Sequence, residues 1–236
     1  MYYPLHYYEG PDETVDPFDK NRQKQVVSLI RVQFLKRFES SARAFERSCE
    51  RLFVRLLTFV TRHSETATEK NHLERWKRRH ADVIAYIKEH DHELWGDDED
   101  DEKNEDLVSD ELLEGVEYLD RTNYRVGEML TETYDDLDQA LEFLRELQKF
   151  QSKHDDKLNA LIKLLKTDPV MSKHKVLLFT EYADTARYLE HELDEADIDG
   201  LDRVDSSTKR KRNDIIRAFA PYYNDSSSPD LARKGM

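Results

Sequence analysis

The pattern of apolar and polar positions predicts helices over most of residues 20–166. Residues 20–62 contain neither Gly nor Pro, and their apolar positions recur at the three- and four-residue steps of an amphipathic helix. We predict one long helix there. Its weakest point is the adjacent pair Ser40 and Ser41, because serines lower helix propensity. The same pattern predicts further helices at residues 68–90, 110–119, 124–151 and 155–166.

The predicted helix at residues 124–151 carries a regular seam of apolar side chains. They alternate at steps of three and four residues, namely Leu130, Tyr134, Leu137, Leu141, Leu144 and Leu147. Such a seam packs against another helix. We favour antiparallel packing on the long N-terminal helix over an intermolecular coiled coil, because the seam extends over only about three heptads.

The pattern changes after residue 174. Residues 175–180 include the consecutive apolar residues Val176, Leu177, Leu178 and Phe179, a length and composition typical of a buried strand. A helix is predicted at residues 183–196, a second strand at 198–204 after a turn at Gly200, and a last helix at 208–219. Strand, helix, strand, helix with short connections predicts parallel sheet in an α/β domain.

Composition supports a helix-rich protein. Charged residues make up 37% of the 236 residues, and Gly and Pro number only six each. Residues 1–19 are interrupted by prolines and predicted to be extended, and the tail at 222–236 is predicted to be disordered. The chain lacks a long apolar run and has a single cysteine, so we expect no membrane span and a cytoplasmic location.

Charge is unevenly distributed along the chain. The net charge is −14, yet residues 20–90 hold an excess of Lys and Arg, and residues 91–156 hold a large excess of Asp and Glu. Six consecutive acids at residues 97–102 repel one another, which predicts a solvated loop within residues 96–106. The six glycines are isolated from one another, so the chain has no glycine-rich phosphate loop and no nucleotide cofactor site of its own.

Several segments resemble the Swi/Snf-type superfamily-two helicases. They are FLKRFESSARAF at residues 34–45, DKLNALIKLL at 156–165, KVLLFTEY at 175–182, TARYL at 185–189, and VDSS with IIRAF between residues 204 and 219. The first resembles the helix that leaves the first motor lobe in bacterial members, and the others resemble the opening of the second lobe. Residues 47–154 then correspond to a variable helical insertion.

The resemblance implies a fold and a division of the chain. The fold class is mainly α, a long helical bundle, followed by a truncated α/β RecA-like half-lobe. The implied segments are an extended N-terminus at 1–19, a helical linker and insertion at 20–154, the start of the second lobe at 155–221, and a tail at 222–236. One departure is Ser206, which follows Asp205 at a position where the family usually has Gly. Serine allows a narrower range of backbone angles than glycine does.

The resemblance also implies a function. Family members translocate on double-stranded DNA by closing two lobes on one ATP and its magnesium ion. The first lobe supplies the phosphate loop, and late motifs of the second supply an arginine finger. This chain carries neither motif, so we expect a fragment or subunit of such a helicase that does not hydrolyse ATP alone and needs the missing motor-lobe segments as partners.

Candidate nucleic-acid-binding residues follow from the resemblance and from clustered bases. Thr180 corresponds to a position where the family contacts the DNA backbone, and Lys36 and Arg37 lie near the seam between lobes. Consecutive bases at residues 209–212 oppose the dipole of the helix they begin, which favours a phosphate contact by Lys209, Arg210 and Arg212.

The alternative is a different class of protein. In it the chain is a stand-alone helical interaction module that binds a partner through the acidic loop and the leucine seam.

Overall fold

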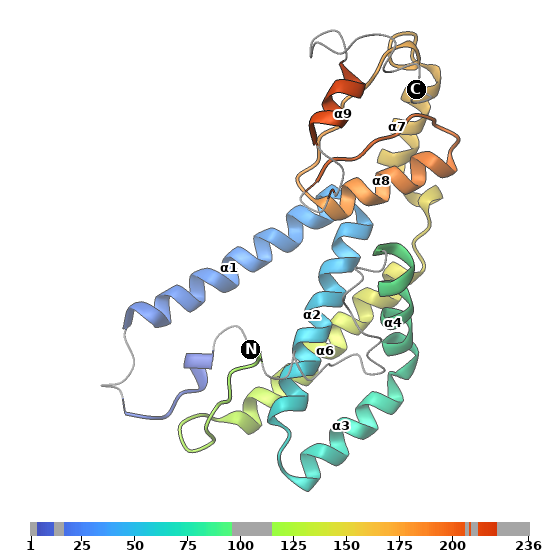
Figure 1. Cartoon of the computed structure of the whole chain (residues 1–236). Helices are drawn as coiled ribbons and strands as arrows, with labels where there is room; N and C mark the ends of the chain where they lie inside the picture. Colours follow the sequence, from blue (N-terminus) through green and yellow to red (C-terminus); the bar gives the residue numbers. More distant parts are fainter. Residues whose placement is uncertain (1–3, 12–16, 96–114, 206–207, 209–211, 221–236) are drawn as a thin grey trace. The chain divides into compact units, whose positions relative to one another are not determined.

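The computed structural model describes residues 4–11, 17–95, 115–205, 208 and 212–220 (Figure 1). The chain divides into two compact units. The first comprises Met1–Lys36 and Phe45–Lys149, and the second comprises Arg37–Ala44 and Phe150–Met236.

The long N-terminal helix is broken at one residue. Helix α1 covers Pro17–Ser40 and α2 covers Ala42–His63, with Ser41 between them. The Ser41 hydroxyl accepts a hydrogen bond from the backbone N–H of Ala44 at 3.0 Å, which is the geometry of a helix N-cap. The break therefore occurs at the weakest point that the sequence identified.

The helix predicted at residues 68–90 is in fact two helices, α3 at Ala67–Arg79 and α4 at Ala81–Trp95, separated by His80. The His80 side chain is buried against the Trp76 ring, with 4.7 Å between ring centroids, and its Nδ1 accepts a hydrogen bond from Arg145 of α6 at 3.3 Å. Contacts with a distant helix thus fix the bend. The local sequence gives no sign of the break, because it contains neither Gly nor Pro here.

Helix α6, Val126–Gln148, places its leucine seam inside the first unit. Leu137, Leu141 and Leu144 are fully buried in one apolar core with residues of α2, α3 and α4. Phe45 at the start of α2 stacks edge-on against Phe143 near the end of α6, so the two helices are antiparallel, as the ribbon also shows (Figure 1). The predicted antiparallel packing is confirmed.

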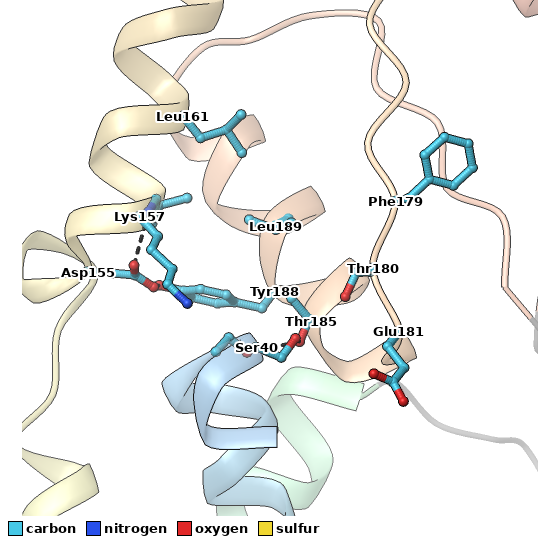
Figure 2. A pocket seen from close by; sticks show the side chains of 12 residues that line it. Ser40, Asp155, Lys157, Leu161, Phe179, Thr180, Glu181, Thr185, Tyr188 and Leu189 are labelled. Atoms are coloured by element: carbon cyan, nitrogen blue, oxygen red, sulfur yellow. Dashed lines mark hydrogen bonds between the residues drawn. The ribbon is translucent and has the colours of Figure 1, made fainter. Parts of the chain in front are cut away.

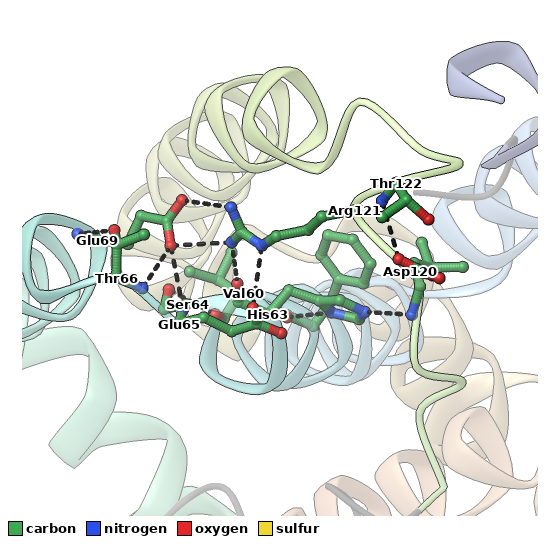
Figure 3. Close-up of polar contacts among 11 residues, drawn as sticks. Val60, His63, Ser64, Glu65, Thr66, Glu69, Asp120, Arg121 and Thr122 are labelled. Carbon is green, nitrogen blue, oxygen red and sulfur yellow. Dashed lines mark hydrogen bonds and ion pairs between the residues drawn. The ribbon is translucent and has the colours of Figure 1, made fainter. Parts of the chain in front are cut away.

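A polar corner closes the turn between α2 and α3 (Figure 3). Arg121 binds both carboxylate oxygens of Glu69, at 3.1 and 2.9 Å, and donates to the carbonyl of His63 at 2.7 Å. The His63 ring joins the same corner: Nδ1 lies 3.0 Å from the Phe59 carbonyl, and Nε2 accepts from the Leu119 N–H. This pair of bonds requires a neutral ring with its proton on Nδ1. Burial lowers the pKa of His63, which also favours the neutral ring.

The N-terminal segment is tied to the first unit rather than simply extended. A short 3₁₀ turn, η1 at Pro4–Tyr7, buries the Tyr7 ring, and Tyr8 forms an isolated antiparallel bridge with Tyr124. Within the predicted helix at 110–119, residues 115–119 form a turn and an irregular connection. The remainder of that prediction lies outside the described residues.

The second unit contains α7 at Asp156–Thr167, α8 at Ala183–Glu195 and α9 at Arg212–Phe219, with short 3₁₀ turns η3 at Ser152–His154 and η4 at Met171–Lys173. All three α-helices match predicted ones. Its buried apolar side chains include Leu158, Tyr188, Leu193 and Ile215. A turn at Gly200, whose φ is +74°, reverses the chain after α8, in a conformation that favours glycine.

The two strands predicted in this unit are not formed. Among the described residues, neither 175–180 nor 198–204 is part of a sheet. A strand is stable only when its backbone groups pair with a neighbouring strand, and these two segments do not pair with each other. The described fold is therefore mainly helical.

Two predictions fall outside the described residues, the acidic loop at 96–106 and the disordered tail at 222–236. Among the helices that are described, none combines the length and apolar character needed to cross a membrane.

Candidate functional site

A hollow of about 360 Å³ lies within the second unit (Figure 2). Its residues come from four places along the chain: the junction of α1 and α2, the start of α7, the segment before α8, and the first two turns of α8. Leu158, Leu161 and Leu189 supply apolar side chains, and hydroxyl groups supply most of the polar ones. The hollow is therefore shared by the segments at 34–45, 156–165, 175–182 and 185–189, which carry most of the helicase resemblance.

Three hydroxyl groups join the α1–α2 junction to α8. The Ser40 and Thr185 hydroxyls share a hydrogen bond of 2.8 Å, and the Ser41 and Thr185 hydroxyls share one of 3.1 Å. Thr185 is buried in the first turn of α8. Because Ser41 also caps α2, this small network fixes the helix break and the start of α8 together.

Arg37 strengthens the same junction. Its Nη1 lies 2.8 Å from a carboxylate oxygen of Asp184, and the Asp184 side chain is only 7% exposed. The guanidinium also lies over the Tyr182 ring, 4.7 Å from the ring centroid. A charge-assisted hydrogen bond and a cation–π contact thus engage this arginine.

The start of α7 completes the wall of the hollow. Asp155 caps α7 by accepting from the Leu158 N–H at 3.0 Å, and its other oxygen accepts from the Tyr188 hydroxyl at 3.1 Å. Burial and the Asp155 charge raise the pKa of Tyr188, so this phenol remains a hydrogen-bond donor. Lys157 donates to the Glu39 carbonyl near the end of α1.

The segment before α8 is apolar and exposed. Phe179 is 91% exposed and points away from the hollow, and Leu177 and Leu178 are 52% and 45% exposed (Figure 2). Among the described residues, the main chain of 176–179 has no hydrogen-bond partner. Lys175 holds one end of this segment, because its ammonium group donates to the Ala218 and Phe219 carbonyls at the end of α9.

The predicted nucleic-acid-binding residues are only partly brought together. Thr180 lines the hollow, and its hydroxyl lies 3.4 Å from the Tyr182 N–H. Arg37 is engaged by Asp184, whereas Lys36 belongs to the first unit. Arg212 is exposed at the start of α9 and donates to the Asp205 carbonyl at 3.3 Å. Lys209 and Arg210 lie outside the described residues.

Sequence reasoning missed the two residues that hold the junction, Asp184 and Thr185. Their partners lie about 145 positions earlier in the chain, and no local motif connects the two segments. Their only signal was a position in the first turn of a predicted helix, where an acid and a hydroxyl residue are common.

The polar lining of the hollow consists of hydroxyls together with the charged side chains of Asp155, Lys157 and Glu181, and includes neither His nor Cys. Elsewhere in the described part of the chain, no three His, Cys, Asp or Glu side chains gather as a metal ion requires. Cys49, the single thiol, is buried in the first unit, and burial raises its pKa to about 12.

Comparison of the chain with protein-family models, with curated proteins and with solved structures identifies no match.

Proposed function

We propose that this chain is one part of a Swi/Snf-type DNA translocase. It provides the helical linker between the motor lobes and the first elements of the second, RecA-like lobe. ATP-driven movement on double-stranded DNA then requires other segments, which carry the phosphate loop and the arginine finger. On its own the chain binds no nucleotide productively.

One observation carries this proposal. The segments that resemble the family are far apart in sequence, and in the second unit they meet through side-chain bonds. Arg37 pairs with Asp184, and Ser40 and Ser41 both bond to Thr185. A connection between two lobes has to be anchored on the lobe it enters. The junction of α1 and α2 is anchored in this way on the first turn of α8.

The exposed segment at 176–179 gives independent support. Adjacent residues of a strand point to opposite faces of a sheet, so four consecutive apolar residues are typical of a strand covered on both faces. Here the side chains of Leu177, Leu178 and Phe179 are exposed, Val176 is half-buried, and the main chain is unpaired among the described residues. This fits a strand whose neighbours in the sheet come from a further segment of the motor.

The site residues have different roles in this proposal. Arg37 acts as a structural anchor, because its guanidinium is already engaged by Asp184 and Tyr182. Thr180 follows the proposed strand, and side chains at the carboxyl ends of parallel strands are where open α/β sheets place their ligands. Thr180 and Arg212 are therefore the proposed contacts to the DNA backbone within the described residues.

Reconstitution of ATP hydrolysis tests the proposal. The purified chain is assayed for phosphate release with and without linear double-stranded DNA. The assay is then repeated with the polypeptides encoded by the neighbouring reading frames that carry the phosphate loop and the arginine finger. We expect no turnover by the chain alone and DNA-stimulated turnover by the mixture, and omission of the chain should abolish it.

Two results contradict the proposal. One is DNA-stimulated ATP hydrolysis by the chain alone. The other is the absence of both motifs from the flanking reading frames. As a control, substitution of the phosphate-loop lysine in the partner polypeptide should abolish turnover of the mixture, which assigns the nucleotide site to that partner.

A further inference from the structure

Helix α1 exposes an apolar strip. Leu29, Val32 and Leu35 are 57%, 46% and 64% exposed. Successive helical residues are rotated by 100°, so this strip lies on the side of α1 opposite Val27, Ile30 and Phe34, which are half-buried. A helix with apolar residues on both sides is typical of a buried helix. We therefore expect another protein surface to cover this strip.

The strip is accompanied by positive charge. Arg22 and Arg31 are exposed on α1, one on each flank of the strip because nine residues separate them, and neither takes part in an ion pair within the described residues. An acidic and partly apolar surface is therefore the complementary partner.

Helix α6 offers such a surface in the same unit. Asp135 and Glu142 lie seven residues apart, hence on one face, and they are exposed and without an ion pair within the described residues. Other exposed acids share or border that face, namely Glu128, Glu132, Asp136 and Glu146. We call these residues the acidic face of α6. Next to them on the same helix is the aromatic ring of Phe143, which is 55% exposed.

An apolar hollow of about 200 Å³ lies next to the acidic face. Its lining includes Phe45, Cys49, Leu52 and Ala140, together with Asp136, Gln139 and Phe143 at the exposed edge of α6. Phe34 of α1 also lines it. Since Phe34 lies on the side of α1 opposite the apolar strip, the strip of a chain points away from that chain's own hollow.

We propose that α1 docks on the hollow and acidic face of α6 in a second copy of this chain. The apolar strip covers the aromatic edge of the hollow, and Arg22 and Arg31 lie against Asp135 and Glu142. Two-fold symmetry gives the same contact twice. Each contact then needs to bury only about half of the ~1,600 Å² typical of a stable interface. This inference concerns the first unit and is independent of the translocase proposal.

Charge-reversal variants test the contact. One full-length variant carries Arg22→Glu and Arg31→Glu, and the other carries Asp135→Lys and Glu142→Lys. Sedimentation equilibrium of the unaltered chain should give a dimer. Each variant alone should be monomeric over the same range, with a dissociation constant raised at least about tenfold, because both contacts then place like charges together.

Mixing the two variants is the decisive step. In the mixed dimer one contact pairs an acidic α1 with a basic α6, and the other pairs the native basic α1 with the native acidic α6. Both contacts are complementary, so the mixture should form a heterodimer although neither variant forms a homodimer.

Matched controls change the same charges elsewhere in the first unit. Lys70→Glu with Arg78→Glu, and Glu74→Lys with Glu89→Lys, alter exposed side chains of α3 and α4 and should leave dimerisation unchanged. Leu29→Ser with Leu35→Ser should weaken it. A chain that is monomeric at all concentrations overturns the proposal. So does a dimer that survives both charge reversals, or a mixture of the variants that fails to associate while both remain folded by circular dichroism.

Discussion

Removing the Arg37 guanidinium should loosen the start of α8. In Arg37→Ala, Asp184 loses its ion pair at 2.8 Å while its side chain remains 7% exposed, and Tyr182 loses the cation above its ring. A hydrogen bond to a charged group contributes about 1.5–3 kcal/mol, and a part-exposed cation–π contact contributes about 0.5–1 kcal/mol. Arg37 is itself 25% exposed, so solvent screening reduces the first figure. We expect a loss of about 2–3 kcal/mol in the second unit.

Amide hydrogen exchange of α8 is the appropriate assay. Tryptophan fluorescence would miss the effect, because both tryptophans, Trp76 and Trp95, lie in the first unit. If the α8 amides exchange through unfolding of the second unit, a loss of about 2.5 kcal/mol in its free energy of unfolding speeds their exchange about 60-fold. Arg217→Ala removes an equal charge from exposed surface of α9 and serves as the control, with little change expected.

A double-mutant cycle isolates the pair itself. Arg37→Ala and Asp184→Ala should show a coupling free energy of about 1–2 kcal/mol, because the two side chains are in direct contact. Unchanged α8 exchange in Arg37→Ala, or a coupling below about 0.3 kcal/mol, refutes the assignment of Arg37 as an anchor.

Three further predictions concern the first unit and use tryptophan fluorescence in urea. Leu137→Ala, at a fully buried position, should lower the free energy of unfolding by about 2–5 kcal/mol; a loss below 1 kcal/mol contradicts the buried seam. Arg121→Ala should cost about 2 kcal/mol because it removes a two-pronged bond to Glu69, and Arg121→Lys should recover only part of that; full recovery by lysine would mean that charge alone matters. Burial lowers the pKa of His63 below its ordinary value of about 6.5, so the unfolded chain binds the proton more tightly and stability should fall as the pH drops below about 6.5. His63→Gln should make that fall smaller, and an unchanged pH profile in this variant contradicts the neutral ring.

Helix positions could be predicted because apolar periodicity is a local property. The spacing from Leu130 to Leu147 located α6 and its buried face. The paired serines located the break between α1 and α2, since a serine that caps one helix also ends its predecessor. The bend at His80 could not be predicted. It depends on Trp76 stacking and on Arg145, which is 65 residues away in sequence.

The two predicted strands are not formed among the described residues, and the reason is physical. Apolar runs such as 176–179 indicate how a segment would be buried, whereas strand formation depends on a neighbour that pairs with its backbone. Among the described residues that neighbour is not provided by 198–204.

The candidate site was predicted at the level of segments rather than bonds. Arg37 was proposed as a nucleic-acid contact because sequence shows a base and cannot show that Asp184 neutralises it. The corner formed by Arg121, Glu69 and His63 has no sequence signature at all, because three separate segments supply it.

The most direct test of the translocase account is amide exchange at residues 176–179. We expect rapid exchange in the isolated chain, where these amides have no hydrogen bonds among the described residues. Addition of the polypeptide that carries the late motifs of the second lobe should slow their exchange by at least about 100-fold, since strand pairing protects amides until the sheet opens. Rapid exchange that persists in the assembled complex, or protection already present in the isolated chain, contradicts the account.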